Sequence, residues 1–99
     1  MQITEKGKQV ATSLEFAQQM KTFLAELHAE GVPEKVGTAA GVSLIAWVLT
    51  GHDIDRPPQT DDELAALAIF CDSHAKEIEA AGGAIITTLC NVDCGPTIH

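Results

Sequence analysis

Aromatic side chains are scarce in this sequence, which has three Phe, one Trp and no Tyr among its 99 residues. With so few rings, the core must be aliphatic and rich in Ala, and the 45% share of hydrophobic residues can supply it. That share, with 20% charged residues, is typical of a globular protein rather than a disordered one. The length suits one core, so we expect a single helical domain over residues 1–99.

Basic residues are also few: six stand against fourteen acidic residues, and the formal net charge is −8. They are scattered along the chain as Lys6, Lys8, Lys21, Lys35, Arg56 and Lys76. Such a surface repels nucleic-acid phosphates and anionic lipids, so we expect neither nucleic acid nor membrane as a partner. A basic protein surface suits the charge better, although the charge also serves solubility alone.

The sequence has no long apolar run. Its first nine residues lack the apolar segment of a signal peptide. The longest apolar stretch, residues 36–49, is interrupted by glycines and hydroxyl residues and falls short of the roughly 20 residues of a membrane span. We therefore expect a cytoplasmic protein with reduced cysteines, and the odd number of three also argues against a disulfide framework.

A first helix is predicted over residues 13–30. Thr12 and Glu15 have the spacing of a capping box, and apolar side chains follow at helical intervals. Gly31 marks its end. Two alternatives remain open for the preceding residues: the helix begins earlier, near Thr4, or residues 2–10 form a strand.

A second helix is predicted over residues 34–50, with Pro33 before its first turn and Gly51 after its end. Residues 36–49 are small or apolar on every side, which is the pattern of a buried helix. Two neighbouring helices cannot cover all its sides, so residues 84–90 or a second copy of the chain must cover the rest. The spacing of Gly37 and Gly41 lets another helix approach closely.

A third helix is predicted over residues 61–81, after a proline-containing loop at 52–59. Thr60 and Glu63 form a second capping box, and residues 82–83, both glycine, end the helix. Residues 84–90 are apolar and β-branched, which predicts a short strand or a fourth helix, and 91–99 are expected to be a loop. The fold class is therefore a mainly α, compact three-helix domain.

The best candidate for a metal site combines cysteine and histidine near the C-terminus. Zinc takes four such ligands, which Cys71, His74, Cys90 and Cys94 can supply, with His99 in reserve. The spacing matches no well-known zinc motif. In the alternative interpretation, Cys71 is a small residue of the hydrophobic core and the protein binds no cofactor.

Enzymatic signals are weak. The acidic residues of the 52–63 segment could hold a hard cation, but helix capping already explains those at 61–63. Cys71 and His74 could pair as nucleophile and base, yet nothing supplies an oxyanion hole. We therefore expect no enzyme.

The pattern favours a small acidic interaction or regulatory protein that self-associates and binds or blocks a partner protein. A second hypothesis is a small-molecule-binding oligomer with a pocket between helices or subunits, where Trp47, His52 and Arg56 make contacts. A third is a zinc-stabilised domain built on the cysteine and histidine set.

Overall fold

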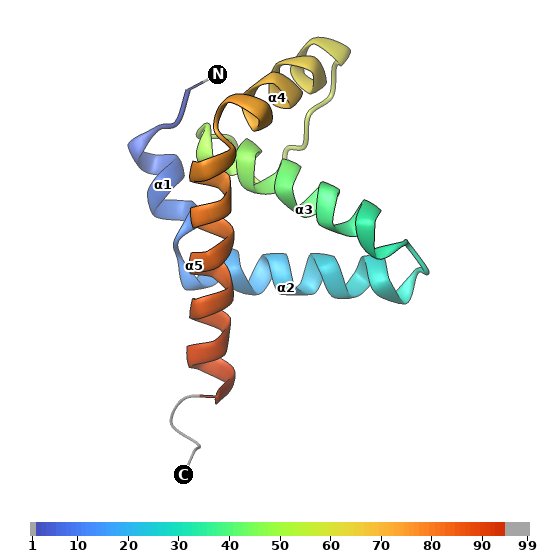
Figure 1. Cartoon of the computed structure of the whole chain (residues 1–99), viewed down its shortest axis with the longest axis vertical. Helices are drawn as coiled ribbons and strands as arrows, with labels where there is room; N and C mark the ends of the chain where they lie inside the picture. Colours follow the sequence, from blue (N-terminus) through green and yellow to red (C-terminus); the bar gives the residue numbers. More distant parts are fainter. Residues whose placement is uncertain (1, 95–99) are drawn as a thin grey trace.

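Five α-helices form all of the regular secondary structure in the part of the chain that the computed structural model describes, residues 2–94, with side chains as far as residue 91 (Figure 1). In chain order they are α1 (Glu5–Ala11), α2 (Leu14–Ala29), α3 (Glu34–Leu49), α4 (Asp61–Ser73) and α5 (Ala75–Cys94). The predicted mainly α class is confirmed, but the predicted count of three helices is wrong.

The N-terminal segment forms a helix of its own, α1, so the alternative of a strand at 2–10 is wrong. The Thr4 side chain caps α1 by accepting a hydrogen bond of 2.8 Å from the Gly7 amide. The backbone N–H of Thr4 donates to the carbonyl of Leu49, at 3.0 Å, which ties α1 to the end of α3. A helix does begin after Thr4, as one alternative held, but it ends at Ala11.

The first predicted helix is α2, and its bounds agree with the prediction within a residue. The cap, however, is Ser13, whose hydroxyl accepts from the Phe16 amide at 3.1 Å. The prediction that Thr12 caps this helix is wrong because Thr12 ends α1 instead: its hydroxyl donates to the Lys8 carbonyl at 2.9 Å.

The third predicted helix is broken after Ser73 into α4 and α5. No glycine or proline lies next to this break. His74 leaves helical geometry, with ψ at 33°, and Figure 1 shows α4 turned away from the axis of α5. Conversely, the predicted stop at residues 82–83 is wrong, and α5 continues through both glycines. The strand at 84–90 is therefore wrong, and these residues belong to α5 rather than to a separate fourth helix.

Burial explains why α5 passes through its two glycines. Ile78, Ala81 and Ile85 lie one or two turns apart on the same side of the helix, and each is buried. Two helical glycines cost roughly 1 kcal/mol each relative to alanine. Packing of an apolar face supplies most helix stability in proteins, and here it outweighs that cost.

The C-terminal half of α3 is the centre of the core, as the sequence predicted. Six consecutive residues, 45–50, are buried, which is only achieved when a helix is covered on every side. The cover comes from α1, α2, α4 and α5, all of which contact α3. Helix α1 thus supplies cover that the sequence had left to residues 84–90 or to a second copy.

The N-terminal half of α3 is different. Gly37 and Gly41 face α2, as their spacing predicted: a Cβ on Gly41 would lie 3.4 Å from the Met20 methyl carbon. The remaining sides are open, and Val36 is 56% exposed. The molecule measures 49 × 34 × 23 Å, and Figure 1 shows α5 crossing α2 and continuing past it. Within the described residues, no helix has the length and apolar character needed to span a membrane.

Candidate binding site

Trp47, His52 and Arg56, the predicted ligand contacts, meet where the chain leaves α3. The indole N–H of Trp47 donates to the backbone carbonyl of Arg56 at 2.7 Å. The His52 ring stacks on the Trp47 rings, with centroids 3.7 Å apart and planes inclined by 13°. These contacts hold the 51–60 segment against the end of α3.

Thr50 completes this arrangement and indicates which ring nitrogen of His52 carries a proton. Its hydroxyl donates to the Trp47 carbonyl at 2.8 Å and lies 2.9 Å from Nδ1 of His52. A hydroxyl has a single hydrogen, so when it is given to the carbonyl, Nδ1 of His52 must carry the proton of the second hydrogen bond. The indole N–H of Trp47 and Nδ1 of His52 are therefore engaged in holding the loop.

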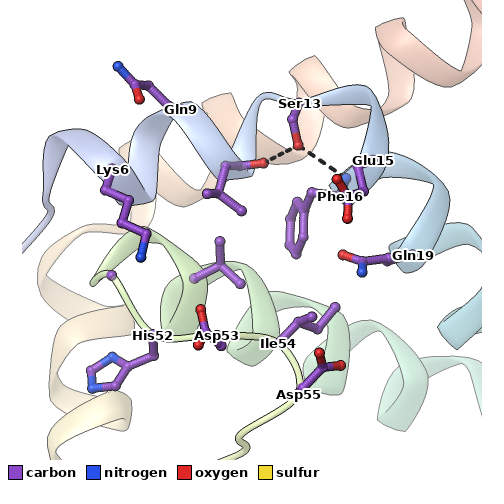
Figure 2. Close-up of a pocket in the computed structure, with 13 residues that line it drawn as sticks. Lys6, Gln9, Ser13, Glu15, Phe16, Gln19, His52, Asp53, Ile54 and Asp55 are labelled. Carbon is purple, nitrogen blue, oxygen red and sulfur yellow. Dashed lines mark hydrogen bonds between the residues drawn. The ribbon is translucent and has the colours of Figure 1, made fainter.

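A hollow of about 400 Å³ lies between α1, α2 and residues 51–55 (Figure 2). Phe16 and Val48 are among its apolar lining residues, and Figure 2 shows the Lys6 side chain directed into it. The His52 ring is directed away from the hollow, toward Trp47. The hollow combines apolar with many polar side chains, and it is one place where a small molecule could bind. The small-molecule hypothesis stays a prediction.

A second hollow, which we call the Trp47 hollow, has a volume of about 470 Å³ and lies between α2, α3, the loop and α4. Its lining residues are Phe23, Ala40, Ser43, Leu44, Trp47, Ile54, Pro57, Pro58, Leu64, Leu67 and Ala68. Apart from the indole, Ser43 has the only polar side chain among these described residues. Leu64 stands at its edge and is 52% exposed. The Trp47 hollow therefore suits apolar side chains better than a polar ligand.

A third hollow, which we call the α3–α5 groove, has a volume of about 480 Å³. Its lining residues are Val42, Ile45, Cys71, Ala75, Ile78, Glu79, Gly82, Gly83 and Ile86. Ile86 is 64% exposed, and nothing lies within 4 Å of the place where a Cβ on Gly83 would stand. The backbone of α5 is thus directly approachable at this groove.

The predicted zinc ligands are placed far apart where they are described. Cys71 and His74 lie around the end of α4, but α5 carries Cys90 about 22 Å along its axis from Ala75. Burial, with Asp72 beside it, raises the pKa of the Cys71 thiol and so disfavours the thiolate that zinc requires.

Within the described part of the chain, no three His, Cys, Asp or Glu residues are grouped as a metal site. This includes the acidic 52–63 segment. Nδ1 of His74 is buried without a hydrogen-bond partner, and its ring instead stacks on Phe70 with centroids 4.3 Å apart. The side chains of Cys94 and His99 lie outside the described residues, and the zinc hypothesis stays a prediction.

Comparison with known proteins adds no relative: no family model, no curated protein and no solved structure matches the chain significantly. The surfaces just described therefore provide the indications of function. Sequence reasoning identified Trp47 but missed Phe23 and Leu64, which line the same hollow. Both belong to apolar helix faces, and nothing local to either residue distinguishes a hollow from a closed core.

Proposed function

We propose that this protein is a non-enzymatic interaction protein that self-associates through the α3–α5 groove and binds a partner protein at a separate surface. The observation that carries the proposal is the uncovered apolar surface on α3 and α5. Val42 is 36% exposed and Ile86 64% exposed, and both line one groove. Exposed apolar side chains that share a hollow mark an association site more often than single scattered ones do.

The shape of the groove favours a helix as the associating element. Gly83 leaves the α5 backbone open beside the apolar side chains that line the groove, so the backbone of a second helix can come close there. A second copy of the chain offers such a helix in its own α5. Two symmetric copies would each present the same patch, which is the usual geometry of a dimer.

Size-exclusion chromatography with light scattering tests self-association. We expect the protein to form a dimer or larger oligomer at concentrations of tens of micromolar, and Ile86→Glu to give a monomer because a carboxylate would be buried in the interface. Thr87→Glu is the matched control, since Thr87 is exposed and does not line the groove. A wild-type protein that stays monomeric at about 100 µM would contradict the proposal.

A further inference from the structure

We infer that the Trp47 hollow binds an amphipathic helix of a partner protein, whose apolar side chains enter the hollow while its Lys and Arg side chains face the acidic residues around it. The inference rests on the partner-binding half of the proposed function and specifies the chemistry of that partner. It does not depend on self-association, which uses the α3–α5 groove.

The lining of the hollow selects apolar groups. Among the described residues that line it, Ser43 has the only polar side chain besides the indole of Trp47, and the indole N–H is already bonded to the Arg56 carbonyl. Small-molecule sites orient their ligands with a few precisely placed polar groups, and the lining residues offer almost none. Apolar side chains of a protein need no such groups, because the partner's own fold orients them.

The charges around the hollow have one dominant sign. Residues three or four positions from a lining residue on the same helix are its surface neighbours. The charged residues at those positions are all acidic: Glu26 on α2, and Asp61, Glu63 and Asp72 on α4. In the loop, Asp55 and Arg56 stand between the lining residues and offset each other. The rim is therefore net negative, and it complements a basic partner.

The walls of the hollow favour a helix over an extended strand. Helices α2, α3 and α4 form three of its sides, and the amides of a helix interior are already bonded within the helix. An added strand needs an open sheet edge, and the described residues contain no strand. A helix that places apolar anchors at intervals of three and four residues needs only the side-chain surface that this hollow presents.

Trp47 provides a direct measurement, because it is the only tryptophan and it lines the hollow. The probe is a synthetic peptide of leucine and lysine, patterned as an amphipathic helix and free of aromatic residues. We expect it to change the Trp47 fluorescence with a dissociation constant in the micromolar range. The same peptide with glutamate in place of lysine is expected to bind at least about tenfold more weakly, because the rim repels it.

Two variants place the binding site. Leu64→Gln removes an apolar side chain from the edge of the hollow and is expected to weaken binding of the leucine–lysine peptide about tenfold or more. Ile69→Gln is the matched control on the same helix, because Ile69 is 67% exposed and is not among the lining residues. We expect its affinity to equal that of the wild type.

Each contrary result overturns a defined part of the inference. If both variants lose binding equally, or if neither variant loses binding, the peptide does not enter the hollow. Equal binding of the lysine and glutamate peptides would contradict the inference that the partner is basic. Octanol causing the same fluorescence change would indicate a small apolar ligand instead. A monomeric Leu64→Gln variant would make a second copy the occupant, whereas failure of self-association alone leaves these peptide results unaffected.

Discussion

Gly7 lies where α1 meets the carbonyl end of α3, and no side chain fits there. A Cβ on Gly7 would overlap the carbonyl oxygen of Leu49 and lie 2.6 Å from that of Val48. Both are backbone atoms, so relief requires a shift of a whole helix. We expect Gly7→Ala to lower the free energy of unfolding by about 2 kcal/mol or more, measured by urea denaturation.

The control for this substitution is Gly83→Ala in α5. Nothing lies within 4 Å of a Cβ at Gly83, and the residue is helical and exposed. This change is expected to raise the free energy of unfolding by about 0.5–1 kcal/mol, because alanine has the higher helix propensity. If both changes destabilise equally, the close contact at Gly7 is not the cause.

Single residues also show how far the sequence can be interpreted. Trp47 contacts both His52 and Arg56, because a short loop after a helix end keeps them close. What the sequence could not reveal is the direction of the indole N–H, which depends on the path of the loop. Their role in binding stays a prediction, whereas their role in holding the loop is visible in the hydrogen bonds.

At the scale of elements, the start of α4 is the feature that pH should affect. Thr60 and Glu63 form the predicted capping box. The Glu63 carboxylate accepts a hydrogen bond from the Gln59 amide at 3.0 Å, and this bond is the main cause that lowers its pKa below the ordinary value of 4.5. The folded state therefore favours the charged form, and the stabilisation is fully present above the ordinary pKa and lost as the pH falls through the lowered one.

We accordingly expect the stability difference between the wild type and Glu63→Gln to shrink as the pH is lowered from about 6 to about 3. Thermal unfolding followed by circular dichroism measures it. Gln18→Ala, a change at an exposed residue of α2 that removes no carboxylate, serves as the control and should give a stability difference without this pH dependence. A constant difference between wild type and Glu63→Gln across this range would be inconsistent with the capping role of the charge.

Helix bounds were predictable where the signal is local. The cap at Thr60 and the left-handed glycines, Gly31 with φ at 82° and Gly51 with φ at 89°, lie within a residue or two of the ends that they define. The cap of α2 is Ser13, one residue after the predicted Thr12. The break at His74 was not predictable, because it follows from how α4 and α5 must each reach the core. The glycines of α5 were misread for the same reason: burial on one face decided the outcome.

At the scale of the whole molecule, the net charge of −8 acts differently on the two proposed associations. Copies of an acidic chain repel each other, and salt screens that repulsion. A basic partner is attracted, and salt screens that attraction as well. Raising the salt concentration from about 50 mM to about 500 mM should therefore strengthen self-association and weaken binding of the leucine–lysine peptide. Light scattering and Trp47 fluorescence follow the two effects, and a shared salt response would mean that they use one surface.

The apolar character of α3 was predictable from its residues, and so was its burial in the C-terminal half. The open N-terminal half was not, because the sequence does not show that α5 crosses α2 and passes beyond it. The Trp47 hollow could not be predicted from the sequence for a similar reason. It is made from segments between positions 23 and 68, and their separation depends on the angles between helices rather than on any residue.

The attachment of α1 to the end of α3 also sets an order of events during synthesis. A helix of seven residues is not stable alone in water. The carbonyl that receives the Thr4 amide belongs to Leu49, about 45 residues later in the chain. Residues 5–11 therefore cannot complete this contact until residue 49 has been synthesised. Helix α1 thus precedes α3 in the chain but depends on the end of α3 for its attachment.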